Sequence, residues 1–344
     1  MKPLILGVAY HGNRLLSHVE SDMRDIADNR FNTVVHMFSH NDWDRHSKVM
    51  KEIFDISFAE GLDVWVDNWG LGGPPGDKSH FLCYHPEAHQ YFSDGEMIPT
   101  SVCLNSEAYV AWTKEWIDLV YDCGGRKIFW DEPHLKMTED RFACGCPTCK
   151  KLFAERYGRE MPVVPDADCC DFQEWSIVNY FKKVTAYASL KGMYNSVCVM
   201  LRGGIGISLD NIGAFGALDS LHNIGSDPYW VGLGLTGADV YKYVYENAKR
   251  NIAVADSCGK DHNIWVQGYN IPRGTEEDVV YATEAAYDAG ARQIFVWGYR
   301  GSEGNNYRAK QPSVTWRAAC DGFERILDKE RSRIIDEARR KLDV

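Results

Sequence analysis

Two groups of chemically capable side chains lie close together in the middle of this 344-residue chain. Asp131 and Glu132 follow an apolar run of the kind that forms a buried strand. Cys144, Cys146 and Cys149 come next and have the C-x-C-x2-C spacing that brings three thiolates within reach of one cation. The acids could transfer protons, and the cysteines could hold a metal ion.

Paired carboxyl groups suit glycoside hydrolysis, in which one donates a proton and the other acts as nucleophile or base, roughly 5 to 9.5 Å away. Consecutive residues of a regular strand point to opposite faces, so Asp131 and Glu132 are not expected to form one such pair. A partner from another strand end is expected, and Asp227, Asp67 and Glu303 are the candidates. Capping of the next helix, or pairing with an arginine, is the alternative role for each acid.

The cysteine group needs a fourth ligand, because a structural zinc site has four. Cys103 and His134 are the candidates for this position. Reduced thiols without a metal are one alternative, and a catalytic zinc is disfavoured because it would need an open position and His or carboxylate ligands. Most of the 11 cysteines are expected to be small buried apolar residues in a reducing cytosol. We therefore expect a structural Zn²⁺ and no organic cofactor.

Strand-like and helix-like segments alternate along almost the whole chain. The expected strands are 3–9, 33–38, 63–67, 126–131, 196–201, 218–222, 263–267 and 293–297. Eight such alternations, with strands apolar enough for burial on both faces, predict a single (β/α)8 TIM barrel over residues 1–344. The alternative, an open doubly wound sheet, would require a glycine-rich turn after the first strand, which residues 11–14 do not provide.

The helices that should cover the barrel are predicted from apolar residues at helical spacing. They are 19–29, 47–60, 106–122, 149–157, 171–190, 238–256, 275–288 and 313–339. Residues 42–46 are expected to be a solvated loop before the second helix. The long connection at about 70–101 is rich in glycine, proline and aromatic residues, and its length predicts a packed functional loop. The cysteine-rich knuckle covers 144–149.

Reactive side chains of a (β/α)8 barrel gather at the C-terminal ends of its strands. In this chain those ends carry acids, hydrogen-bonding groups and large aromatic side chains. This mixture suits a sugar, because aromatic faces stack on C–H surfaces while polar groups bind hydroxyls. The residues expected to bind substrate are Tyr10, His11, His36, Asp67, Trp69, Arg202, Tyr229, Trp230, Gln267, Trp297, Tyr299, Arg300 and Glu303.

The composition excludes several classes of partner. A net charge of −11 argues against nucleic acid and against an anionic membrane surface. No segment reaches the roughly 18 consecutive apolar residues of a membrane span, and the N-terminus reads as a first strand rather than a secretory signal. We expect a cytoplasmic protein with a small carbohydrate as its partner, and homo-oligomer formation is left open.

Residues 101–158 resemble the catalytic barrel of family 42 β-galactosidases and their relatives in the large (β/α)8 glycosidase clan. The likeness covers roughly a fifth of the chain, and its specific part is the spacing of four cysteines. Its features are the segment 101–106 around Cys103, Trp130-Asp131-Glu132, the C-x-C-x2-C motif, the helix segment 153–158 and, more weakly, Asp227-Pro228-Tyr229. The resemblance implies that Glu132 is the general acid/base and that Cys103, Cys144, Cys146 and Cys149 hold a structural zinc.

The chain departs from the family pattern at two positions. Asp131 stands where the family has asparagine, and Gln267 stands where the family has its nucleophilic glutamate after strand seven. A glutamine amide cannot attack an anomeric carbon. Another glycosidase clan uses acids after strands four and six, an arrangement that would suit Asp131 and Asp227.

Three functions therefore come from the sequence. The first is a glycoside hydrolase acting on a small glycoside or oligosaccharide, with Glu132 as proton donor and Asp131 or Asp227 as its partner. The second is a barrel that binds carbohydrate without cleaving it, because Gln267 replaces the expected nucleophile. The third is a sugar lyase or isomerase, since a fold does not fix the chemistry.

Overall fold

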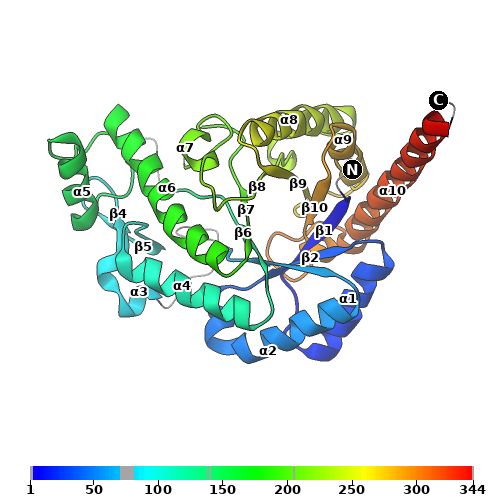
Figure 1. Cartoon of the computed structure of the whole chain (residues 1–344), viewed down its shortest axis with the longest axis horizontal. Helices are drawn as coiled ribbons and strands as arrows, with labels where there is room; N and C mark the ends of the chain where they lie inside the picture. The colour runs from blue at the N-terminus through cyan, green and yellow to red at the C-terminus, as the bar shows by residue number, and fades with distance from the viewer. Residues whose placement is uncertain (1–2, 70–80, 137, 139–140, 204–205, 343–344) are drawn as a thin grey trace.

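Eight parallel strands close into a barrel in the order β1-β10-β9-β8-β7-β6-β3-β2 (Figure 1). The computed structural model describes residues 3–69, 81–136, 138, 141–203 and 206–342. The barrel strands are β1 (Ile5–Tyr10), β2 (Thr33–Met37), β3 (Asp63–Asp67), β6 (Lys127–Trp130), β7 (Tyr194–Cys198), β8 (Asn223–Ser226), β9 (Asp261–Gln267) and β10 (Gln293–Trp297). This topology confirms the predicted (β/α)8 barrel.

Long helices surround the barrel, and α3 (Phe81–Tyr84), α5 (Pro147–Tyr157) and the strands β4 (His89–Tyr91) and β5 (Met97–Val102) lie together on one side of it (Figure 1). The long helices are α1 (Leu16–Asp28), α2 (His40–Ala59), α4 (Glu107–Asp122), α6 (Ala167–Leu190), α8 (Ala238–Ser257), α9 (Asp278–Asp288) and α10 (Pro312–Leu342). The shorter ones are α3, α5, α7 (Gly213–Gly216), η1 (Pro86–Ala88), η2 (Val231–Leu233) and η3 (Tyr299–Ser302). None of the described helices is both long enough and apolar enough to cross a membrane.

Helix α2 begins seven residues earlier than the sequence pattern predicted, at His40. The Ser39 hydroxyl accepts a hydrogen bond from the Asp42 backbone N–H (3.3 Å), and the Asp42 carboxylate accepts one from the Ser39 backbone N–H (3.1 Å). This capping box satisfies two of the free donors at the start of the helix. The expectation of a solvated loop at 42–46 is therefore wrong.

Strand β8 also differs from its prediction, because the apolar residues at 218–222 form a turn instead of a strand. The Leu221 N–H donates to the Leu218 carbonyl (3.0 Å) within this turn. The strand itself, Asn223–Ser226, contains two polar residues and a glycine, so it has no apolar signature. Its Asn223 joins Asn263 and Ser196 in a hydrogen-bonded polar layer inside the barrel.

The long connection after β3 contains structure of its own. Residues 70–80 lie outside the described part of the chain, and α3 and η1 follow them. Strands β4 (His89–Tyr91) and β5 (Met97–Val102) then pair as an antiparallel hairpin. Figure 1 shows this hairpin next to α5, so the connection and the cysteine-rich segment form one side structure of the barrel.

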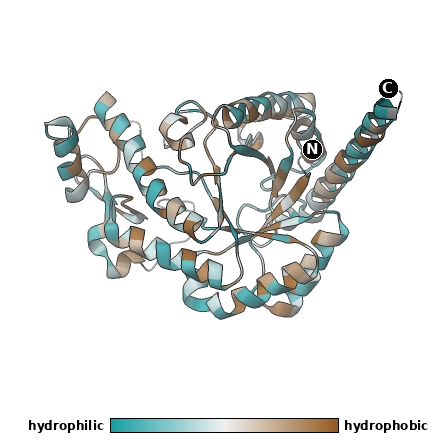
Figure 2. Ribbon diagram, viewed as in Figure 1, coloured by the Kyte–Doolittle hydropathy of each residue, from teal (hydrophilic) through white to brown (hydrophobic). Residues whose placement is uncertain are grey.

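Side chains along each strand alternate between the barrel interior and the layer beneath the helices. The interior is filled by large apolar side chains, among them Trp65, Phe129, Trp265 and Phe295. Outward-facing residues of the same strands pack against helices, each of which carries both hydrophobic and hydrophilic residues (Figure 2). This alternation decides which residues near a strand end can reach the mouth of the barrel.

The capping box makes α2 sensitive to one hydroxyl. Replacing Ser39 with alanine (S39A) removes the acceptor for the Asp42 N–H, and we expect a loss of about 1 kcal/mol in the free energy of unfolding. Ser47→Ala, in the interior of the same helix, is the control and should be neutral or slightly stabilising because alanine favours helix. Urea unfolding measures both variants. Equal stability of S39A and the wild type would contradict the capping role.

Candidate active site at the barrel mouth and a four-cysteine cluster

A cavity of about 260 Å³ opens at the C-terminal ends of the barrel strands. It is lined by acids and aromatic rings: His11, Trp69, Asp131, Glu132, Asp227, Tyr229, Tyr269, Trp297, Asn305 and Tyr307. These residues follow β1, β3, β6, β8, β9 and β10, so six strands contribute to one site. The three acids predicted to be catalytic are brought together here.

The backbone at Glu132 explains how two consecutive acids line the same cavity. Trp130, the last residue of β6, is fully buried in the outer layer, so regular alternation directs Asp131 inward and Glu132 outward. Glu132 instead has φ of +31°, a conformation that residues other than glycine rarely adopt. Its carbonyl also lies 2.6 Å from His134 Nδ1. The expectation that the two acids face opposite ways is therefore wrong.

Buried carboxyl groups in close contact dominate the electrostatics of the cavity. Asp131, Glu132 and Asp227 all line the cavity, where each carboxyl group affects the ionisation of its neighbours. Burial, and then the Glu132 charge, raises the pKa of Asp227 well above its usual value. Burial and Glu132 likewise raise the pKa of Asp131, and burial with Asp131 raises that of Asp67. The site therefore retains protons on carboxyl groups at a pH where ordinary aspartates are ionised.

Aromatic rings form the walls around these acids. The His11 ring lies 5.2 Å from that of Trp69 and 4.9 Å from that of Trp297, in both cases edge to face. Tyr229 and Tyr269 make a second T-shaped contact at 5.2 Å. Burial, and then Arg14, lowers the pKa of His11 to about 4, so its imidazole is neutral at physiological pH. Such walls can hold the C–H face of a sugar ring.

Three residues expected to bind substrate lie instead in the core between the barrel and the helices. Tyr10 is fully buried, and its hydroxyl donates to the Asp22 carboxylate (2.7 Å). His36 lies 2.8 Å from the Ser57 hydroxyl, and burial lowers its pKa to about 3. Trp230 is also buried in this layer. Tyr10 and His36 occupy outward positions of β1 and β2, so the predicted contact with substrate is wrong for all three residues.

The Gln267 side chain hydrogen-bonds to the backbone of a neighbouring loop and does not line the cavity. Its Oε1 accepts hydrogen bonds from the backbone N–H groups of Trp230 (3.0 Å) and Val231 (3.1 Å), and its Nε2 donates to the Tyr269 carbonyl (3.3 Å). These bonds hold the segment that follows Asp227. Gln267 is therefore a positioning residue, and its predicted contact with substrate is corrected.

Asp67 is likewise absent from the cavity lining. It is fully buried at the end of β3, and its contribution to the site is the repulsion that couples it to Asp131. The predicted contact of Asp67 with substrate is therefore wrong, and Asp67 affects the site only through the charge of Asp131.

The remaining predicted residues lie beside the mouth. Arg300 and Glu303 line a neighbouring cavity that also contacts His11, and their charged groups are 3.6 Å apart. Tyr299 lines it too, but its hydroxyl donates to Asp25 of α1 (2.8 Å). Arg202 is exposed and lines neither cavity. The structure therefore separates these four from the acids.

Three lining residues were not among the predicted site residues. Tyr269 comes two residues after the end of β9, within the range where strand-end residues reach a barrel mouth. Asn305 and Tyr307 come from the loop after η3. An aromatic residue in a polar loop was the available signal for Tyr307, whereas nothing in the sequence marked Asn305.

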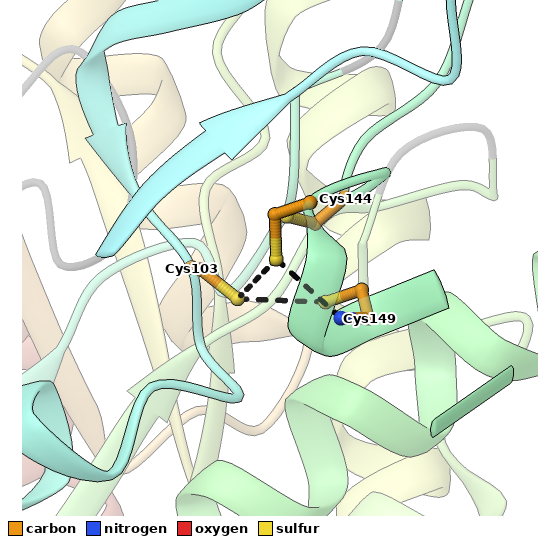
Figure 3. A group of neighbouring side chains, drawn as sticks. Cys103, Cys144 and Cys149 are labelled. Atoms are coloured by element: carbon orange, nitrogen blue, oxygen red, sulfur yellow. Dashed lines mark hydrogen bonds between the residues drawn. The ribbon is translucent and has the colours of Figure 1, made fainter. Parts of the chain in front are cut away.

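Four cysteines form a buried cluster beside the barrel. The sulfur atoms of Cys103, Cys144, Cys146 and Cys149 all lie within 4.8 Å of one another. Cys103 Sγ is 3.4 Å from Cys149 Sγ and 3.6 Å from Cys146 Sγ. Four thiolates placed tetrahedrally at about 2.3 Å from a zinc ion would be about 3.8 Å apart. The group can therefore hold a metal ion, as Figure 3 illustrates for three of its members.

The surroundings of the cluster also suit thiolate ligands. The Asn105 amide donates to Cys149 Sγ (3.3 Å), and the Cys149 backbone N–H points to Cys146 Sγ (3.4 Å). Such hydrogen bonds orient metal ligands and offset negative charge on sulfur. His134, the other candidate for fourth ligand, is outside the cluster, with its Nδ1 at the Glu132 carbonyl. Cys103 takes that position.

Comparison with known proteins supports the fold but identifies no family. No protein-family model matches the sequence, and no curated protein matches it either. An endo-1,4-beta-mannanase from Rhizomucor miehei has a similar structure, with a TM-score of 0.60 and 12% identity over 93% of this chain and 95% of that one. The family 42 resemblance is thus not confirmed.

Two further solved structures extend this comparison. A GH5_18 protein from Streptomyces cattleya, solved with Manb1-4GlcNAc, has a TM-score of 0.59 and 12% identity over 92% of this chain and 79% of that one. A D-psicose 3-epimerase from Clostridium cellulolyticum has a TM-score of 0.52 and 10% identity over 93% and 97%. At such identities the likeness shows the fold alone.

The raised pKa of Asp227 predicts a stabilising substitution in the site. Between about pH 4, where an unfolded aspartate ionises, and the native pKa, the folded protein binds more protons, so stability falls as pH rises. Asp227→Asn cannot ionise, and we expect it to gain about 1 kcal/mol over the wild type near pH 7, with little gain below pH 4. Urea unfolding across this range measures the difference.

The exposed Asp256 provides the matched control for this substitution. Asp256→Asn should follow the wild-type pH dependence throughout. An Asp227→Asn variant whose stability relative to the wild type does not change with pH would show that Asp227 ionises normally.

Proposed function

We propose that this protein is a carbohydrate-active enzyme, a glycoside hydrolase that acts on a small glycoside at the barrel mouth. One observation carries the proposal: Asp131, Glu132 and Asp227 line one aromatic-walled cavity, in which burial and the neighbouring acids raise the pKa of Asp131 and Asp227. A protonated carboxyl beside an ionised one supplies the acid and the base that glycosidic bond cleavage needs. The names of the mannanase neighbours agree with this chemistry.

The proposed roles follow from the electrostatics of the pair. Asp227 keeps a proton because ionising it would place a second charge beside Glu132. Asp227 therefore acts as the proton donor to the leaving oxygen, and Glu132 acts as the ionised partner that assists attack at the anomeric carbon. Asp131, which also faces the cavity, competes with Asp227 for protons, because each of the two carboxyl groups raises the cost of ionising the other. These roles reverse the one that the family 42 resemblance implied for Glu132.

The cavity favours a small substrate. Its volume of about 260 Å³ lies near the lower limit of small-molecule sites, roughly 300 Å³. Trp69 and Trp297, with ring centroids 6.2 Å apart, form one wall, and Tyr229 and Tyr269 form another. A terminal sugar residue could stack on these rings while its hydroxyls reach the acids and Asn305.

A sugar epimerase or isomerase is the second candidate. A protonated carboxyl group in the same cavity as other acids also suits proton transfer to and from a carbon next to a carbonyl, and two solved neighbours are D-psicose 3-epimerases. Hydrolysis and isomerisation leave different products. Proton NMR in D₂O would show a new reducing end in the first case, and deuterium at a sugar carbon without bond cleavage in the second.

The four-cysteine cluster is proposed to hold a structural zinc ion. Four sulfurs at these separations form a closed site, which matches the structural rather than the catalytic type. When bound, the ion would cross-link the end of β5 to the start of α5 through Cys103 and the other three cysteines. It would thereby anchor the side structure that follows the catalytic segment at 131–132.

Substitution of the acids tests the proposed reaction. In a screen of aryl glycosides, we expect Asp227→Asn and Glu132→Gln to lower turnover by about 10²–10⁴-fold, because each removes one half of the acid–base pair. Glu155→Gln, on the exposed surface of α5, is the control and should keep wild-type turnover. Near wild-type turnover in either acid variant would rule out the proposed pair, whereas no turnover by the wild type on any glycoside would favour epimerisation or simple binding.

Metal analysis tests the zinc site. We expect one zinc per chain after dialysis, and loss of that zinc in Cys103→Ser together with a fall of more than about 2 kcal/mol in stability. Cys83→Ser, at an exposed cysteine outside the cluster, should retain both the metal and the stability. Wild-type protein purified without chelator that contains no zinc would contradict the proposal.

A further inference from the structure

A second aromatic pocket lies at the edge of the barrel, on the end where the mouth opens. It encloses about 330 Å³ and is lined by His40, Trp43, Asp44, Phe81, Tyr84, His85 and Trp112. The first turn of α2, helix α3 with the residue after it, and helix α4 supply these residues. None of these seven residues lines the central cavity, so the pocket is a separate site.

The rings of this pocket pack as a preformed surface. Trp43 stacks on Trp112 with centroids 4.8 Å apart and an interplanar angle of 25°. Phe81 lies 5.1 Å from Trp112 and stacks on His85 at 4.4 Å. Tyr84, at the rim, is 81% exposed. Flat rings that already support one another need little reordering to receive the C–H face of a ligand.

His40 supplies the polar part of the pocket. Its side chain is buried, with only 7% of the residue exposed, and it packs edge to face against Trp112 at 4.0 Å. Neither ring nitrogen has a hydrogen-bond partner among the described residues. A buried polar group without a partner costs about 1–3 kcal/mol, so its presence beside a cavity indicates a ligand that completes it.

The state of the imidazole restricts the kind of ligand. Burial lowers the pKa of His40 to about 3, so the ring is neutral and offers one N–H donor and one acceptor nitrogen. A quaternary ammonium ion neither donates nor accepts a hydrogen bond, and a carboxylate only accepts one. A hydroxyl group does both, and a sugar presents several of them beside an apolar face.

We infer that this pocket is a second carbohydrate-binding site, in which a pyranose ring stacks on Trp43 and Tyr84 and hydrogen-bonds through its hydroxyls to His40, while Trp112 supports Trp43 from behind. This site goes beyond the proposed reaction, because its residues line a different cavity from the one that contains the acids. It would hold a remote part of an oligosaccharide, or a second molecule, on the face that carries the mouth.

Binding of short oligosaccharides tests the inference. Mannotriose, cellotriose and β-1,4-galactotriose are titrated by calorimetry into the full-length Asp227→Asn protein, in which turnover is suppressed. We expect one of these trioses to bind at two sites per chain. When Trp43→Ala or Tyr84→Ala is added to the Asp227→Asn protein, we expect the affinity of the second site to fall about tenfold. Phe58→Ala, a half-exposed aromatic residue at the far end of α2, is the matched control and should leave both sites intact.

His40→Phe separates ligand binding from a structural role. It keeps an aromatic ring against Trp112 but removes both nitrogens, so we expect unchanged or higher thermal stability together with about tenfold weaker binding at the second site. Affinity and stoichiometry that are unchanged in Trp43→Ala and His40→Phe would overturn the inference. The inference would also be overturned if tetramethylammonium, and none of the trioses, bound at a site that is lost in Trp43→Ala.

Failure of this site and failure of the proposed reaction give different results. The reaction is judged by turnover of aryl glycosides in the wild type, which the variants at Trp43 and His40 should leave unchanged. If Asp227→Asn loses turnover and no triose binding depends on Trp43, the proposed reaction is supported and the second carbohydrate-binding site is rejected. If triose binding depends on Trp43 but the wild type turns over no aryl glycoside, the second site is supported and the proposed reaction is rejected.

Discussion

The left-handed backbone conformation of Glu132 is the constraint on which the candidate active site depends. Without it, alternation along β6 would direct only Asp131 into the barrel and leave the Glu132 carboxylate in the outer layer. With it, both acids face the cavity, and the Glu132 charge raises the pKa of Asp227. Such strained conformations persist where the surroundings enforce them, and they are concentrated at functional sites.

The segment after Glu132 is held from several directions. Beyond the His134 contact, the Pro133 carbonyl accepts the Ile207 N–H (3.0 Å). Gly206, with φ of +68°, lies so close that a Cβ there would be 2.2 Å from the same carbonyl. Further along, the cysteine cluster fixes residues 144–149 against the end of β5. The proposed zinc site and the strained acid thus lie on one continuous stretch of chain. The side structure holds the far end of this stretch, and Gly206 and Ile207 hold the end near Glu132.

The sequence predicted the barrel correctly because the strands of a (β/α)8 fold are apolar and separated by regular helices, a pattern that periodicity detects. It also placed Asp131 and Glu132 at the mouth, since the end of β6 is recognisable, whereas Asp227 was placed there from a strand predicted too early, at 218–222. It failed where the outcome depends on backbone conformation or on side-chain direction. Alternation could have assigned Tyr10 and His36 to the outer layer, whereas the φ of Glu132 and the hydrogen bonds of Gln267 have no signature in the sequence.

The proposed reaction requires that Asp227 keep its proton beside Glu132, and the aromatic walls and the strained turn have meaning for catalysis only if it does. The most direct measurement is a carbon-13 NMR titration of the aspartate carboxyl groups, in the wild type and in Glu132→Gln. The account predicts that Asp227 keeps its proton well above the pH at which the exposed Asp256 ionises, and that its pKa falls when the Glu132 charge is removed. Ionisation of Asp227 at the ordinary aspartate value in both proteins would contradict it.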